Sequence, residues 1–182
     1  MEAVTLEHLA AQTELVRRSP RDRAPIELIV RRPAHDERDV LEEAVLDSAL
    51  GLVGDDWIRR GSSSTPDGSA DPESQLTIMN TRVLAAFAPD RAMWPLAGDQ
   101  LYADLDISLE SMPAGTRLAI GDAEVVVTAK LHTGCSLFMR RYGAASLAWI
   151  SSPAGTELRM RGVYVRILRG ATIRVGDVIH RI

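Results

Sequence analysis

The chain has 182 residues, 46% of them hydrophobic and 25% charged, which is typical of a single globular domain, and no stretch approaches the roughly 20 apolar residues of a membrane helix. Its net charge of -4 argues against a nucleic-acid partner, because general affinity for nucleic acid needs an excess of positive charge. The N-terminus lacks the basic start and apolar centre of a secretory signal, and one cysteine forms no internal disulfide, so we expect a soluble protein of the cytoplasm.

The start of the chain predicts a helix followed by a strand. Apolar residues in 5–18 recur every three or four positions, the spacing of one helical face, and two prolines follow. The run 26–32 is rich in β-formers and predicts a strand. The segment 39–50 suits a helix by its spacing and extended structure by its shortness, so both remain open. We expect residues 1–25 to form a helical extension and residues 26–182 to form the main domain.

Residues 59–74, RRGSSSTPDGSADPES, are the one low-complexity tract. They are rich in Ser, Gly, Pro and Asp and contain nothing to bury, which predicts an exposed, mobile loop.

The rest of the chain reads mainly as short strands. A strand at 74–80 is followed by a short helix that Pro89 ends, and then by an extended stretch at 98–108. Five more short β-like runs follow, and a helical pair interrupts them; the runs are GTRLAIG, AEVVVTAK, RGVYVRILRG, ATIRVG and DVIHRI. We therefore predict a mainly β (α+β) fold, a closed or nearly closed β-barrel with a few short helices, because closure leaves no unpaired edge strand.

Basic side chains carry no local signal. Lys130 is the only lysine, and every other basic side chain is an arginine. This bias extends over the whole chain, so it indicates composition rather than a site.

The only cysteine, Cys135, lies in the segment TAKLHTGCSLF. A lone cytosolic cysteine is usually an inert, partly buried residue. Here it follows a glycine and precedes residues at helical spacing, so we expect its sulfur near a helix N-terminus, where backbone donors favour the thiolate. Cys135 is then a candidate nucleophile or soft metal ligand, and the nearby His132 a candidate proton carrier. The small number of Cys and His residues excludes structural zinc.

The segment AKLHTGC resembles the cysteine loop of the MOSC domain, the module named from the C-terminal part of molybdenum cofactor sulfurases. The resemblance covers nearly all of residues 26–182, in the order GLVGDDW, LTIMN, AGDQLYADLDIS, PAGTRLAIGDAEVVVTAKLHTGC and RGVYVRILRGATIRVGDVI. It implies a β-rich barrel with short helices that holds a molybdenum-pterin cofactor. It also implies that Cys135 binds the metal and that the cofactor or its pocket involves His132, Thr133, Gly134, Asn80, Arg82, Asp99 and Asp104.

Two positions depart from the family pattern. Small members often have lysine two residues after the cysteine, where this chain has Leu137, and often read Gly-Asp-Arg-Trp where this chain has Asp56 in place of the arginine. Both changes remove positive charge, and the added carboxylate would repel an anionic ligand unless an arginine compensates.

The sequence leaves three functions open. The first is a molybdenum-cofactor oxidoreductase that acts on small N-hydroxylated or similar substrates, with electrons from a separate donor protein. The second is a sulfur carrier in which Cys135 takes up sulfur as a persulfide from a separate cysteine desulfurase, since the chain is too short to include the pyridoxal-phosphate domain of full sulfurases. The third is a binding protein without catalysis.

Overall fold

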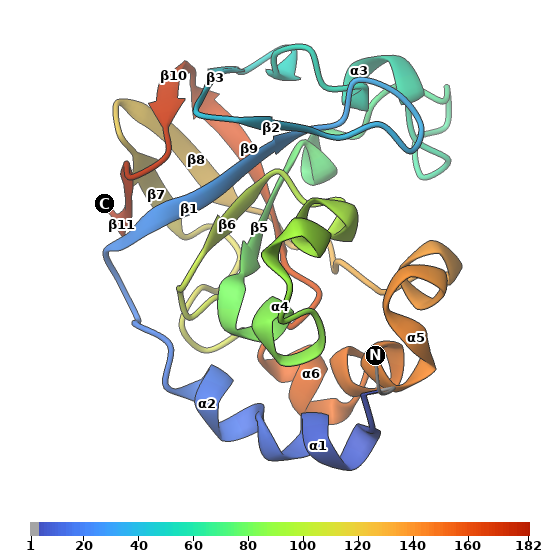
Figure 1. Ribbon diagram of the computed structural model, residues 1–182. Helices are drawn as coiled ribbons and strands as arrows, with labels where there is room; N and C mark the ends of the chain where they lie inside the picture. Colours follow the sequence, from blue (N-terminus) through green and yellow to red (C-terminus); the bar gives the residue numbers. More distant parts are fainter. Residues whose placement is uncertain (1–3) are drawn as a thin grey trace.

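The computed structural model describes residues 4–182 and has a closed, seven-stranded β-barrel at its centre (Figure 1). The barrel closes because β1 pairs with β6 on one side and with β11 on the other. This confirms the predicted closed barrel with a few short helices. In spatial order its strands are β1 (Ala24–Arg31), β11 (Val178–Arg181), β7 (Arg117–Ile120), β8 (Ala123–Val127), β9 (Val163–Arg169), β5 (Leu76–Asn80) and β6 (Leu101–Ala103).

One pair of barrel strands is parallel, and this pair shapes the site. The strands β5 and β6 run parallel, whereas the other pairs in the barrel are antiparallel. Parallel neighbours need a crossover connection. Here the crossover contains α4 (Thr81–Phe87) and the 3₁₀ segment η2 (Arg91–Ala97), and it returns to the barrel through Gly98 and Asp99.

A small second sheet lies beside the barrel. It contains β3 (Glu43–Asp47), β4 (Gly51–Leu52) and β10 (Ala171–Arg174), and β2 (Asp39–Leu41) pairs with β1 at the barrel edge. Most of the segment 39–50 is therefore extended rather than helical. The short helix α3 (Trp57–Arg60) follows β4, and a 3₁₀ turn, η1 (Pro72–Ser74), precedes β5.

The helices cover one side of the barrel. The N-terminal helix predicted over 5–18 is in fact two helices, α1 (Leu6–Ala11) and α2 (Thr13–Arg17), which break at Gln12. The predicted helical pair is α5 (Ser136–Ile150), which kinks at Gly143, and α6 (Pro153–Glu157). Within residues 4–182, no helix has the length and apolar character needed to cross a membrane.

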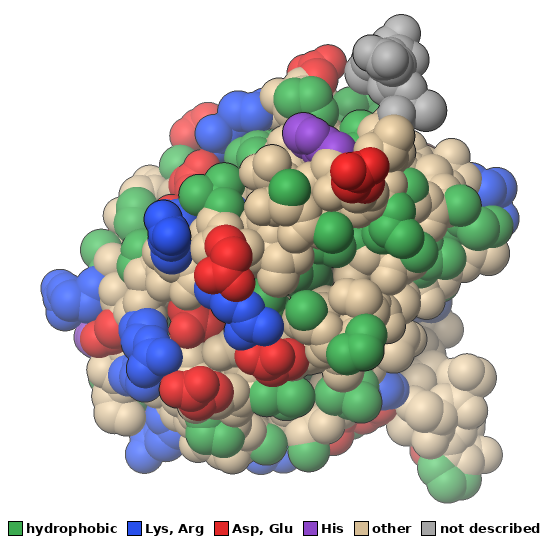
Figure 2. Space-filling model, turned by 90° about the horizontal axis from the view of Figure 1, so that it is seen from below, with side chains coloured by type: hydrophobic (Ala, Val, Ile, Leu, Met, Phe, Trp, Pro, Cys, Tyr) green, Lys and Arg blue, Asp and Glu red, His purple; other side chains and the backbone are tan. Residues whose placement is uncertain are grey.

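Two apolar clusters hold these layers together. One fills the barrel, where alternate residues of each strand point inward, as Val163, Val165 and Ile167 do on β9. The other lies between the barrel and the helices and includes Leu9 and Trp149. On the face that Figure 2 shows, acidic and basic side chains are interspersed.

The serine-rich tract 59–74 forms a largely exposed loop, as predicted. Its fixed point is Asp71, whose Oδ2 accepts hydrogen bonds from Lys130 Nζ at 2.5 Å and from Ser64 Oγ at 3.0 Å. The only lysine thus joins this loop to the segment that carries the cysteine. The mobility of the loop stays a prediction.

Candidate functional site

The cysteine lies at the end of an extended segment, 128–135, that connects β8 to α5. Its side chains alternate between partly buried or buried positions, occupied by Thr128, Lys130, His132 and Gly134, and exposed ones. An extended chain turns successive side chains to opposite sides. Cys135 is therefore exposed because it occupies one of the alternate positions whose side chains point outward.

Cys135 is the N-cap of α5, as the sequence predicts. The residue before it packs closely on α5, because a Cβ added to Gly134 would lie 2.3 Å from Leu147 Cδ1 and 3.2 Å from Ile150 Cδ1, so these two side chains would have to move. The glycine thus lets the loop lie directly on α5, and this fixes the backbone that carries the sulfur.

Cys135 lines a pocket of about 280 Å³. The walls come from the β1–β2 connection, α3, the end of η2 and the first turns of α5, which lie on the same side of the barrel (Figure 1). Besides Cys135, most of the titratable side chains that line the pocket are basic. They are Arg32, Arg38, Arg60, Arg141, Arg161, His35 and His132, and the acidic ones are Asp36 and Asp56. The pocket therefore combines one thiol with five guanidinium groups.

Both departures from the family pattern lie in this pocket, because Leu137 and Asp56 line it. The carboxylate of Asp56 is compensated by an arginine on the next turn, since Arg60 Nη1 lies 2.8 Å from Asp56 Oδ1. Arg60 is thus the arginine that compensates the charge of Asp56.

Three side chains, those of Asp99, Arg161 and His132, form a trio beside the cysteine loop. Arg161 Nη1 lies 2.6 Å from Asp99 Oδ2, and the other carboxylate oxygen, Oδ1, lies 3.5 Å from His132 Nδ1. The imidazole also stacks on the ring of Tyr164, with 4.4 Å between centroids. Gly162 (φ +105°) makes room for this arrangement, because a Cβ there would lie 3.0 Å from Asp99 Oδ1.

The trio sets the charge states of its members. Burial lowers the pKa of His132 well below its usual value, and the positive charges of Arg161 and Arg32 lower it further. Burial also raises the pKa of Asp99, against the opposing effect of Arg161. The fold therefore favours the neutral form of the His132 imidazole at physiological pH.

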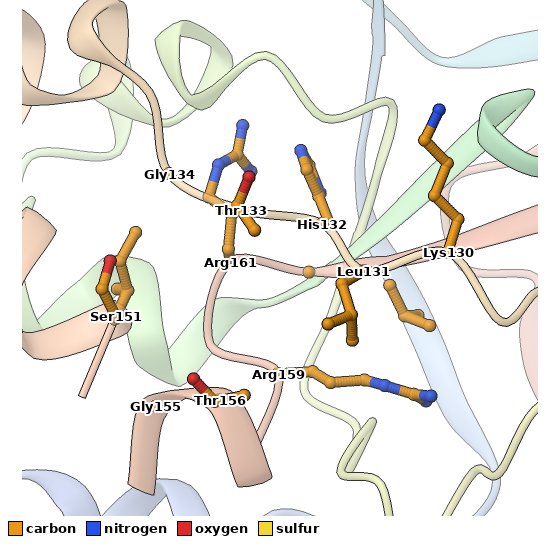
Figure 3. Close-up of a pocket in the computed structure, with 13 residues that line it drawn as sticks. Lys130, Leu131, His132, Thr133, Gly134, Ser151, Gly155, Thr156, Arg159 and Arg161 are labelled. Atoms are coloured by element: carbon orange, nitrogen blue, oxygen red, sulfur yellow. The ribbon is translucent and has the colours of Figure 1, made fainter. Parts of the chain in front are cut away.

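A second, smaller hollow shares part of this pocket's wall (Figure 3). It has a volume of about 170 Å³, and His132 and Arg161 line both hollows. Figure 3 shows the side chains of His132 and Arg161 pointing the same way, with Ser151 to their left and Thr156 below them. Thr133 and Gly134 line this smaller hollow rather than the cysteine pocket.

The other predicted residues lie elsewhere. Asn80 is buried, caps α4 and donates to Ser19 Oγ and Leu105 O. Arg82 forms an ion pair with Asp104 at 2.8 Å and donates to a carbonyl of α2. These three side chains hold the N-terminal segment to the barrel and line neither hollow that His132 lines.

Sequence reasoning missed the arginines. The pocket is lined by arginines that lie up to 129 residues apart in the sequence, among them Arg32, Arg38, Arg141 and Arg161 (161 - 32). No local motif distinguishes them from the many other arginines of the chain. Only the three-dimensional fold brings them together.

The lowered pKa of His132 gives a pH-dependent prediction. Unfolded His132 titrates near pH 6.5, so its stabilising contribution is complete above about pH 6.5 and falls by about 1.4 kcal/mol per pH unit below it, until the folded pKa is reached. We expect the loss of unfolding free energy between pH 7 and pH 5, measured by urea titration, to be smaller in His132→Gln than in the wild type.

The difference between the two proteins isolates His132 from other titrating groups. Equal pH dependence in His132→Gln and the wild type would show that the imidazole is not kept neutral by the fold.

No model of a protein family matches the chain. A search of curated proteins also finds no match. Several solved structures share the fold. The YuaD protein from Bacillus subtilis superposes with a TM-score of 0.65 at 14% identity, over 86% of this chain and 94% of that one.

Two further structures are YiiM from Escherichia coli and YiiM from Geobacillus stearothermophilus. Their TM-scores are 0.57 and 0.58, and their identities are 15% and 13%. They cover 88% and 87% of this chain, and 69% and 75% of their own. Identities of this size show a shared fold alone.

Proposed function

We propose that this chain is a MOSC-like domain whose cysteine pocket binds a molybdenum cofactor, and that it acts as an oxidoreductase on small N-hydroxylated or similar substrates. The observation that carries the proposal is the exposed Cys135 on the wall of a pocket that five arginines line. The ordered sequence motifs and the barrel shared with YuaD and YiiM support it.

The donor groups fit such a cofactor. A cysteine sulfur is a soft ligand that suits a redox-active metal, and guanidinium groups suit the phosphate of a pterin. Cys135 would hold the metal, and the arginines would hold the anionic part. The bound group would supply two-electron oxygen-atom transfer.

The protein's own part is to orient the ligand and to handle protons. His132 lines the pocket as a neutral imidazole, so it would be the group that accepts a proton released there, and its lowered pKa makes it a weak base that gives the proton up again readily. Arg161 holds one carboxylate oxygen of Asp99 at 2.6 Å, and the other oxygen lies 3.5 Å from His132 Nδ1 without a hydrogen bond to it. Asp99 lines neither hollow, so it would act by holding the guanidinium group of Arg161 in place rather than by touching a ligand.

The test is the metal content of protein from cells supplied with molybdate. We expect wild-type protein to contain stoichiometric molybdenum and pterin fluorescence, and Cys135→Ala to contain neither above background, because the alanine variant has no thiol left. Metal is measured by mass spectrometry, and thermal unfolding confirms that the variant folds. Equal molybdenum in both proteins, or none in the wild type, would contradict the proposal.

The exposure of Cys135 also favours a second function, sulfur transfer. A sulfur that reaches the surface can accept a persulfide sulfur from a separate desulfurase and pass it on. In that case the purified protein would carry one extra sulfur atom, removable by a reductant, and no molybdenum. If Cys135→Ala changes neither metal, sulfur nor reductase activity, a binding protein without catalysis remains.

A further inference from the structure

The smaller hollow, which Cys135 does not line, contains one cation that no carboxylate neutralises. Arg161 on its wall pairs with Asp99 at 2.6 Å. Lys130 on its wall lies 2.5 Å from a carboxylate oxygen of the serine-rich loop. Across residues 4–182, no carboxylate forms an ion pair with the third of these cations, Arg159. Arg159 is only 9% exposed, so water screens its charge poorly.

Arg159 occupies a backbone position that is typical of glycine. It follows Leu158, the C-cap of α6, and its φ of +48° is in the left-handed region, which a bulky residue adopts at a cost in free energy. Its neighbours hold this conformation, because its N–H donates to Thr156 O and its carbonyl accepts from the N–H of Gly162. Glycine would satisfy this turn at a lower cost. The turn itself therefore does not require the arginine side chain.

The protein uses only part of the guanidinium group of Arg159. Nη1 donates to Met112 O at 2.5 Å. Within residues 4–182, Nε and Nη2 have no hydrogen-bond partner, and neither is sealed from solvent, so a ligand in the hollow that Arg159 lines can reach them. Burial lowers the pKa of Arg159, and no nearby carboxylate opposes this effect. A bound anion would supply both the acceptor and the charge that the side chain lacks.

The other walls of this hollow suit a small amphipathic molecule. Leu131 and Val163 supply apolar surface, and Ser151 and Thr156 supply hydroxyl groups at exposed positions. In Figure 3, Ser151 and Thr156 lie to the left of Arg159, whose side chain extends to the right beneath Leu131. The volume of about 170 Å³ is below that of a site for a drug-sized ligand, so the hollow suits a small one.

We infer that this hollow binds a small organic acid, and that Arg159 holds its carboxylate group. The two oxygens of a carboxylate match the parallel donors Nε and Nη2, and its single negative charge balances the single unpaired cation. A phosphate ester carries roughly 1.5 to 2 negative charges, more than this cation neutralises. The apolar body of the acid would lie against Leu131 and Val163. The site lies outside the cysteine pocket and does not depend on the proposed cofactor.

The experiment is titration of butyrate at pH 7 and constant ionic strength, followed by the amide resonances of ¹⁵N-labelled protein. We expect saturable shifts concentrated in residues 131–134 and 155–163, and much weaker binding of butyramide, which has a similar shape without the charge. Arg159→Gly should weaken butyrate binding by about tenfold or more, the effect of losing a charged hydrogen-bond donor. Glycine suits the backbone at this position, and the amide spectrum of the variant confirms that it folds.

Arg38→Gln is the matched control. It removes a guanidinium group from the cysteine pocket and leaves the smaller hollow unchanged, so the affinity for butyrate should change by less than about twofold. Arg159→Lys keeps the charge and loses the paired donors, so its affinity should lie between those of the wild type and Arg159→Gly. Equal weakening by Arg38→Gln and Arg159→Gly, unchanged affinity in Arg159→Gly, or no butyrate binding by the wild type would overturn the inference. Wild-type affinity in Arg159→Lys would also count against a paired carboxylate.

The outcome is separate from that of the molybdenum experiment. Cys135 lines the larger pocket and not this hollow, so Cys135→Ala should bind butyrate as the wild type does. Butyrate binding that depends on Arg159, in a protein that never contains molybdenum, would support the inference and contradict the cofactor. Molybdenum held through Cys135, with butyrate binding indifferent to Arg159, would do the reverse.

Discussion

Replacing Asp99 by alanine is expected to lower the free energy of unfolding by about 3–5 kcal/mol. Asp99 is fully buried, and its carboxylate is the partner of Arg161, which is itself only 7% exposed. Without it, the guanidinium group would remain buried without a counter-charge, while the carbonyl of Ala97 would be its one remaining hydrogen-bond acceptor. Urea titration followed by tryptophan fluorescence measures the change, since the three tryptophans are buried.

The double variant Asp99→Ala with Arg161→Met is the control for this prediction. It removes both charges, so it should be more stable than the sum of the two single losses predicts. If the losses simply add, the ion pair contributes nothing of its own, and the wall behind His132 is held by packing alone.

Trp149→Ala should destabilise the protein to a similar degree, by about 3–5 kcal/mol, because it removes a large side chain from a filled core. Trp149 is 2% exposed and belongs to the apolar cluster that joins the helices to the barrel. Its Nε1 also donates to Thr13 Oγ1 at 3.1 Å, so it contacts the N-terminal helices directly. The loss of unfolding free energy in urea is again the measurement.

Trp149→Phe separates the ring from its hydrogen bond. The phenylalanine keeps most of the apolar contact and loses the bond to Thr13, so a loss of only about 1 kcal/mol is expected. Were Trp149→Ala to cost no more than Trp149→Phe, the N-terminal helices would be an appendage rather than part of the second core.

Local patterns in the sequence predicted the local parts of the structure. Glycine-bounded runs of alternating residues, such as 163–169, became barrel strands because strand period and burial coincide there. The position of Cys135 at a helix N-terminus was likewise predictable, because a cap depends on the residues next to it. The break at Gln12 was not, since the apolar spacing continues through it while the Gln12 N–H donates to Leu9 O, three residues back instead of four.

Contacts between distant segments were beyond the sequence pattern. Asp99 reaches His132 and Arg161 through the crossover that the parallel β5–β6 pair requires, and no motif signals that geometry. Asn80 and Arg82 show the opposite case, because polar residues in suggestive segments serve to cap α4 and to hold the chain end. A single sequence does not distinguish a polar side chain that faces a pocket from one that completes a turn.

The alternation along 128–135 restricts which insertions and deletions this region can accept. Adding or removing one residue between β8 and His132 would exchange the two sides, so that the imidazole would face solvent and its neighbour would meet Asp99 and Tyr164. Adding or removing two residues would keep each side chain on its present side. Variation in length is therefore expected to accumulate in the exposed 59–74 loop and to be rare in the cysteine loop beside it.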